Sequence, residues 1–175
     1  MVATVGVLAF GILKGVLLAA IFSILLLLRR ASNPRIAVLG RLPGTDRFAD
    51  SSRYPESEAI PRVLVLRVES GLFYFNAENV KNEVLQRVRR QGGIEVVVID
   101  LSTSANIDLA GVRMLSELDE QVAQAGASLA LAEVHGDVRD LLHAEGLQTR
   151  IPGVAQRMRI LVLVEQRGPV LSVAS

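Results

Sequence analysis

The chain has 175 residues, enough for one ordinary domain and an appendage, and its formal net charge of +1 argues against a nucleic-acid-binding surface. It has no cysteine, so disulfides, thiol nucleophiles and cysteine metal sites are excluded. The two histidines, His135 and His143, lack the close spacing of a two-histidine metal motif and are expected to be solvated. No metal or other cofactor is expected.

Residues 1–30 are predicted to form a transmembrane segment. The run from Val16 to Leu28 is apolar apart from Ser23, and Lys14 is the only charge in the first 28 residues. The first residues lack the basic character of a secretory signal. A helix over these residues would be about 42 Å long, against a hydrocarbon core of about 30 Å. We therefore expect either a tilted helix or a break near Gly11–Gly15.

Residues 31–61 are predicted to be a juxtamembrane linker, because prolines, glycines and serines recur without sustained periodicity. Basic residues follow the apolar run, and no acidic residue occurs before Asp46. By the positive-inside bias, the helix is expected in the inner or plasma membrane, with the part of the chain after it on the cytoplasmic side. The same side chains could rest on anionic lipid headgroups, which makes membrane lipid an expected partner. These residues are Arg29, Arg30, Arg35 and Arg41.

Strands and helices are predicted to alternate from residue 62 onward. Val63 to Val68 is expected to be a strand, and residues 72–75 are expected to be its hairpin partner after a turn at Gly71. Asn76 is expected to cap the next helix, which ends before residues 92–93. Core packing is the favoured role of the aromatic residues in 72–75, with base stacking as the alternative.

The stretch from Ile94 to Ala127 organises the rest of the domain. An apolar, β-branched run ends at Asp100 and predicts a strand that is buried on both faces. A polar loop follows, and Asp108 stands at the N-cap of a helix whose apolar residues recur every three or four positions. Gly126 closes this helix. Another strand at residues 128–132 and a short helix at 137–145 complete an α/β layer.

This stretch resembles the signature of the STAS domain, which anti-sigma-factor antagonists share with the cytoplasmic tails of SulP-type anion transporters. The matching residues are Asp100-Leu101-Ser102 and Ile107-Asp108-Leu109-Ala110-Gly111. The segments Pro34–Asp46 and Arg53-Tyr54-Pro55 are similar to the connector between the last membrane helix and the STAS domain of SulP-type transporters. The connector favours the transporter branch.

The resemblance implies an α/β STAS-like sheet with helices packed on it, preceded by a transmembrane helix. It implies a carboxy-terminal regulatory part of a sulfate or anion transporter that does not transport alone. Its expected partners are other transporter subunits or regulatory proteins. The alternative is a membrane-tethered module that binds partner proteins as antagonists do. Neither reading is an enzyme, since the chain has no phosphate-binding glycine loop or nucleophile motif.

The candidate site is the loop before the central helix together with the first turn of that helix. Weak binding of an anion or a nucleotide, or binding of a partner protein, is the expected activity, and a plain N-cap is the alternative role of Asp108. In family antagonists a serine just before the motif glycine is phosphorylated, and the residue here is Ala110. Nearby serines could accept phosphate instead. The candidate residues are Ser102, Ser104, Asp108, Ala110 and Gly111.

The domain is expected to cover residues 62–150. Residues 151–175 do not align with the family pattern, which usually ends in a helix. Met158 to Glu165 is predicted to be a strand, and Gly168 to Ser175 is predicted to be a frayed tail.

Overall fold

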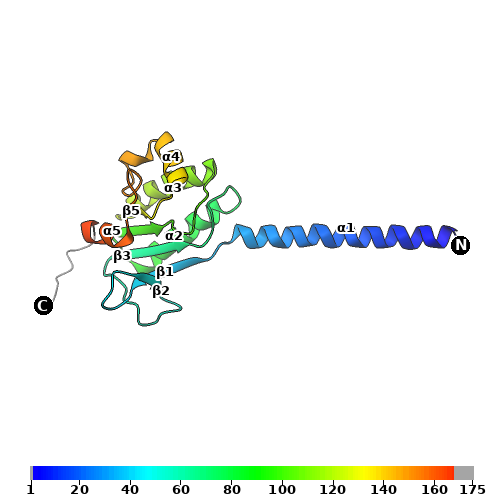
Figure 1. Cartoon of the computed structure of the whole chain (residues 1–175), viewed down its shortest axis with the longest axis horizontal. Helices are drawn as coiled ribbons and strands as arrows, with labels where there is room; N and C mark the ends of the chain where they lie inside the picture. The colour runs from blue at the N-terminus through cyan, green and yellow to red at the C-terminus, as the bar shows by residue number, and fades with distance from the viewer. Residues whose placement is uncertain (1, 168–175) are drawn as a thin grey trace. The chain divides into compact units, whose positions relative to one another are not determined.

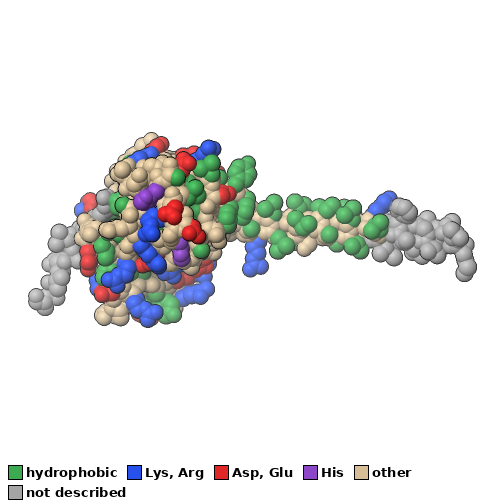
Figure 2. Space-filling model, turned by 45° about the horizontal axis from the view of Figure 1, so that its top comes forward, with side chains coloured by type: hydrophobic (Ala, Val, Ile, Leu, Met, Phe, Trp, Pro, Cys, Tyr) green, Lys and Arg blue, Asp and Glu red, His purple; other side chains and the backbone are tan. Residues whose placement is uncertain are grey.

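The computed structural model describes residues 2–167, which divide after Asn33 into two compact units. The first unit is helix α1, Val2–Ser32, which runs without a break through Gly11–Gly15 (Figure 1). At 1.5 Å per residue its 31 residues are about 46 Å long. The stretch Leu13–Ser32 is long and apolar enough to cross a membrane, and its large side chains are exposed (Figure 2).

The second unit is built on a five-stranded sheet with the order β2-β1-β3-β4-β5. The three strands β3, β4 and β5 are parallel, whereas β1 pairs antiparallel with β3 and β2 pairs antiparallel with β1. The α/β sheet with helices packed on it is therefore confirmed. The strands are β1 (Ile36–Arg41), β2 (Phe48–Asp50), β3 (Val63–Val68), β4 (Val96–Asp100) and β5 (Ser128–Ala132).

The assignment of residues 31–61 as a linker is wrong, because this segment supplies two strands of the sheet. Ala37 and Leu39 of β1 are buried, and Ile36 pairs with Val68 of β3. Gly44, with a φ of 69°, lies in the turn that joins β1 to β2. The proline and glycine signals thus mark a hairpin turn, and strands this short show little periodicity of their own.

The predicted hairpin partner of β3 at residues 72–75 is also wrong. Both edges of β3 are already occupied, one by β1 and the other by β4. Residues 72–75 instead form a loop before helix α2, Ala77–Gln91. Leu72 is buried in this loop and forms an isolated parallel bridge with Ile107.

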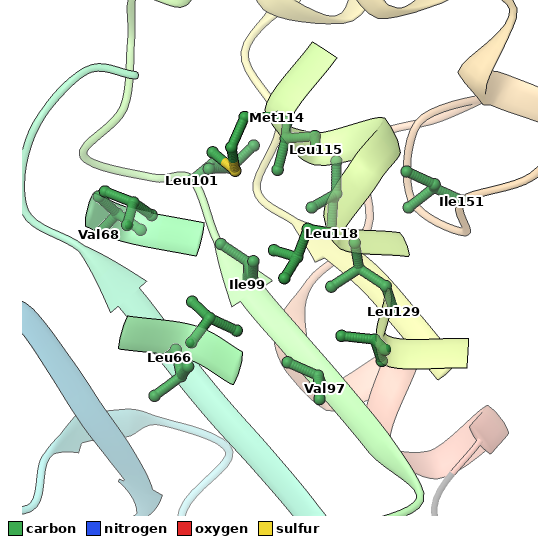
Figure 3. Close-up of a cluster of buried hydrophobic side chains, with 14 of the residues drawn as sticks. Leu66, Val68, Val97, Ile99, Leu101, Met114, Leu115, Leu118, Leu129 and Ile151 are labelled. Atoms are coloured by element: carbon green, nitrogen blue, oxygen red, sulfur yellow. The ribbon is translucent and has the colours of Figure 1, made fainter. Parts of the chain in front are cut away.

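Three helices cover one face of the sheet, where the larger hydrophobic core lies. They are α2, α3 (Leu109–Gln124) and α4 (Gly136–Ala144), with the short 3-10 helix η1 (Leu147–Thr149) after them. Leu115 and Leu118 of α3 are fully buried against Ile99 and Leu129 of the sheet (Figure 3). Each such side chain stabilises the fold by about 1.5–3 kcal/mol relative to exposure. The apolar residues whose periodicity predicted this helix therefore form the face that packs on the sheet.

Helix α5, Ile160–Arg167, packs on the opposite face of the sheet. The prediction of a strand at Met158–Glu165 is wrong. Ile160, Leu163 and Val164 are buried together with Val98 of β4. Their spacing of three and four residues is helical, and it overrides the β-branched composition of the run. The expected frayed tail at residues 168–175 lies outside the described residues.

Lys81 and Asp50 are buried charges that join different segments of the domain. The Nζ atom of Lys81 in α2 lies 2.6 Å from the Glu117 carboxylate of α3 and 2.8 Å from that of Glu78. These hydrogen bonds raise the pKa of Lys81, so its contribution to stability persists until the pH exceeds the usual lysine range. In β2, hydrogen bonds from Ser52 lower the pKa of Asp50, whose carboxylate also binds Arg35 at 2.5 Å. That contribution is lost only as the pH falls below the usual aspartate range.

We predict that Gly153→Ala destabilises the domain by about 2–3 kcal/mol, because overpacking and backbone strain add. Gly153 has a φ of 88°, and a Cβ atom built there would lie 1.8 Å from the carbonyl oxygen of Leu131 in β5. Thermal unfolding of the full chain in detergent micelles, followed by circular dichroism, measures the loss. Gly136→Ala is the matched control, since no atom outside its chain neighbours and its own helix backbone lies within 4 Å of the added Cβ. Equal melting temperatures for the two variants would contradict the packing of this loop on β5.

Candidate functional site

The candidate loop lies at the carboxyl ends of the parallel strands. β4 ends at Asp100, residues 101–107 form the loop, and α3 begins at Leu109. Open α/β sheets bind their ligands at this edge, because the loops there connect strands to helix N-termini. The geometry of the loop therefore decides which chemistry it can offer.

Asp100 is fully buried at the start of the loop and is fully engaged. Its Oδ2 accepts a hydrogen bond of 2.6 Å from Nε of Arg67, and its Oδ1 accepts one of 2.9 Å from the Ser102 amide. A buried carboxylate is tolerated when it is paired in this way. The sequence around Asp100 does not predict its pairing with Arg67, which lies 33 residues earlier. The two residues meet only through the register of β3 and β4. The carboxylate holds the loop in place.

The two candidate serines differ in access. Ser104 is fully buried, and its hydroxyl lies 2.6 Å from the carbonyl oxygen of Ser70 and 3.2 Å from that of Val68. Ser102 is half-buried, and its carbonyl oxygen lies 2.9 Å from Nε2 of His135. Phosphorylation of Ser104 would require the loop to open, whereas Ser102 keeps partial access.

Both histidines lie against backbone carbonyls. Nε2 of His135 donates to Ser102, because a carbonyl oxygen can only accept. His135 is half-buried at the start of α4, and its hydrogen bond ties this helix to the candidate loop. His143 is exposed, and its Nε2 lies 3.1 Å from the carbonyl oxygen of Val154. No group of three potential metal ligands occurs among residues 2–167.

Asp108 is the N-cap of α3, as its position predicted, and it also binds a second segment. Its Oδ1 accepts a hydrogen bond of 2.9 Å from the Gly111 amide, which satisfies one of the free amides of the first helical turn. Its Oδ2 accepts one of 2.9 Å from the Tyr74 amide. The carboxylate therefore covers the positive end of the helix and competes with any external anion.

Gly111 is required by a close contact. A Cβ atom at this position would lie 2.6 Å from the carbonyl oxygen of Leu72 and 2.7 Å from the Ile107 side chain. The first turn of α3 thus packs directly on the loop that precedes α2. The neighbouring Ala110 is half-buried and offers only a methyl group. The loop therefore holds no hydroxyl at the position that antagonists modify.

Asn76 supports the same loop in a way that the sequence did not predict. It stands at the N-cap of α2, but its side chain forms no forward cap. Its Oδ1 accepts a hydrogen bond of 2.8 Å from the Phe73 amide, and its Nδ2 donates one of 3.0 Å to the Gly71 carbonyl. The core role assigned to the aromatic residues here is wrong for Tyr74 and Phe75, which are exposed.

A hollow of about 230 Å³ adjoins the candidate loop at Asp100 and Ser102. Its lining combines cationic and anionic side chains in equal number, so it carries no net charge. The sequence patterns did not predict that these residues lie together, because only the folded sheet brings their distant segments side by side. The charged residues of the lining are Arg47, Arg67, Arg159, Asp46, Asp100 and Glu133.

Comparison with known proteins agrees with this geometry. The STAS domain family matches residues 54–159, and the chain belongs to this family. A "Probable sulfate transporter" of Mycobacterium tuberculosis is 34% identical over 149 residues, which is 85% of this chain and 27% of that sequence. The High affinity sulfate transporter 2 of Stylosanthes hamata is 30% identical over 142 residues, or 76% of this chain and 22% of that sequence. The chain thus spans about a quarter of the length of these transporters.

Solved structures show the same fold. The murine Solute Carrier 26 family member A9 anion transporter, in its inward-facing state, aligns with a TM-score of 0.67 and 21% identity over 77% of this chain and 22% of its own. A proposed anti-sigma factor antagonist of Thermotoga maritima aligns with a TM-score of 0.55 and 18% identity, over 63% of this chain and 91% of its own. The resemblance to SulP-type transporters and to antagonists is therefore confirmed at the level of the STAS domain.

We predict that Asp108→Ala destabilises the domain by about 2 kcal/mol, because it removes both a helix cap and a hydrogen bond to Tyr74. Asp108→Asn keeps one oxygen acceptor and should lose about half as much. Chemical unfolding of the full chain in micelles gives these values, and hydrogen exchange at the Tyr74 amide should speed up in both variants. Asp137→Ala, an exposed acidic residue in the first turn of α4, is the control and should change stability by less than about 0.5 kcal/mol. An Asp108→Ala variant as stable as its parent would contradict the double role of this carboxylate.

Proposed function

We propose that this chain is a membrane-anchored, cytoplasmic STAS domain that serves as the carboxy-terminal regulatory part of a SulP-type sulfate or anion transporter. The main support for the proposal is that the similarity to transporters extends beyond the STAS domain itself. The mycobacterial transporter matches over 149 residues, whereas the STAS family match covers residues 54–159. Only residues 160–175 follow the family match, so most of the additional similarity must precede residue 54, in the part of the chain that joins an apolar helix to the sheet.

The structure supports a regulatory role over a catalytic one. The relatives are transporters and STAS domains, and the ionisable groups of the candidate loop are engaged in holding the fold. Asp100 is paired with Arg67, and Asp108 caps α3. Other transporter subunits or regulatory proteins are the partners that such a domain would contact. An anion or a nucleotide would bind the loop weakly, since the carboxylate of Asp108 already covers the Gly111 amide.

A membrane-tethered module that binds partner proteins as antagonists do is the second candidate. The likeness to the Thermotoga protein, of which 91% aligns, favours it. Ala110 argues against the phosphorylation switch of that class, and of the two nearby serines Ser104 is buried while Ser102 keeps partial access. The two candidates differ in partner rather than in fold.

We predict that the domain lies on the cytoplasmic side of the membrane. Arg29 and Arg30 stand in the last turn of α1, and no charge other than Lys14 precedes them. A green fluorescent protein fused after Ser175 should be fluorescent in cells, and an alkaline phosphatase fused there should be inactive. The Arg29→Ser/Arg30→Ser double variant is the control and should raise the share of inverted chains. Full phosphatase activity of the parent fusion would contradict the orientation.

We predict that the chain alone does not transport sulfate. A transport pathway needs several helices around a site near the bilayer midplane, and residues 2–167 contain one helix that could cross a membrane. Proteoliposomes with the purified chain should show sulfate flux equal to that of empty vesicles. Lys14 is the only charged residue that the apolar segment carries before Arg29, so Lys14→Ala is the informative variant. Saturable uptake that Lys14→Ala abolishes would contradict the proposal.

A further inference from the structure

Exposed hydrophobic side chains gather at one place on the domain. Among the described residues from Pro34 onward, five large hydrophobic side chains are exposed, and three of them lie on the two segments that the Asp108 carboxylate joins. The exposed fractions are 83% for Tyr74, 41% for Phe75 and 44% for Leu109. We call Phe73, Tyr74, Phe75 and Leu109 the aromatic rim. Clustered apolar exposure of this kind marks an interaction surface.

The aromatic rim is held in a fixed conformation. The Phe73 amide donates to Asn76 and the Tyr74 amide donates to Asp108, which also caps the helix that Leu109 begins. The rings of Phe73 and Phe75 stack with centroids 5.5 Å apart. A preorganised surface loses little conformational entropy when it docks. The folded domain therefore maintains this exposure.

The covalent path from the apolar helix leads to the loop that carries the rim. α1 ends at Ser32, and the carbonyl oxygen of Arg35 already accepts a hydrogen bond of 3.0 Å from the Glu69 amide. Three residues can span at most about 11 Å. Glu69 directly precedes the loop of residues 70–75. Only a short stretch of chain therefore separates the end of α1 from the hydrogen bond that precedes the rim loop.

The chemistry of the rim fits a lipid interface. Tyrosine and phenylalanine place an apolar ring among acyl chains, and the tyrosine hydroxyl can remain among the headgroups. Arg113 is exposed one helical turn after Leu109, where its cation can meet anionic headgroups. We propose that the aromatic rim docks on the headgroup region of the bilayer that α1 crosses. This inference rests on the proposed membrane anchoring.

The absence of tryptophan from the chain allows a direct test. Tyr74→Trp places the chain's single tryptophan on the rim, and the 83% exposure of Tyr74 makes the substitution harmless to packing. Gln124→Trp is the matched control. Gln124 is exposed at the other end of α3, about 22 Å from Leu109 along the helix at 1.5 Å per residue. Both full-length variants are reconstituted in vesicles of phosphatidylglycerol and phosphatidylcholine brominated near the headgroup end of its acyl chains. Brominated lipid occupies both leaflets, so the readout does not depend on which side the domain faces.

The expected result is that brominated lipid quenches Tyr74→Trp several-fold more strongly than Gln124→Trp, with a blue shift for the rim probe only. Adding Phe75→Ser and Leu109→Ser to Tyr74→Trp should remove the difference. Equal, weak quenching of both probes in chains that resist alkaline extraction would overturn the inference and leave the membrane anchoring intact. Chains released by alkaline extraction would overturn both. A blue shift without quenching that grows with the protein-to-lipid ratio would show that a second copy covers the rim, which also overturns lipid docking.

Discussion

The close contact between Leu72 and Gly111 is the constraint on which the functional end of the domain depends. No side chain fits between the carbonyl oxygen of Leu72 and the first turn of α3, so the loop before α2 must lie on that turn. Asp108 can then reach the amides of both Gly111 and Tyr74. The absence of a side chain at Gly111 therefore allows the close approach that brings Asp108 within reach of both amides.

The candidate loop is a rigid support rather than an open receptor. The buried Asp100, the buried Ser104 and the capping carboxylate of Asp108 all bind groups of the same domain. Rigid edges of this kind suit recognition by partners or surfaces, because little ordering is required on binding. The STAS domain family to which the chain belongs shares this fold with the solved anion transporter and with the Thermotoga protein.

The sequence predicts what local patterns encode and misses what only the sheet brings together. The buried strand β4, helix α3 and the Asp108 cap follow from periodicity and capping chemistry. The strands β1 and β2 were missed because a strand of three to six residues acquires its pairing from distant partners. The Arg67–Asp100 pair crosses 33 residues of chain for the same reason. The hydrogen bond from the Tyr74 amide to Asp108 likewise joins residues 34 positions apart, which no nearby pattern reveals.

The position of β1 has a consequence for where the domain can be divided. The family match begins at residue 54, after both antiparallel strands, yet the sheet begins at Ile36. A fragment that starts at the family boundary would leave β3 as an apolar edge strand with unpaired backbone groups. Such exposed edge strands pair with strands from other molecules. By pairing with β3, strand β1 thus also protects the domain from aggregation. The outer strand β2, only three residues long, offers little backbone for further strand addition.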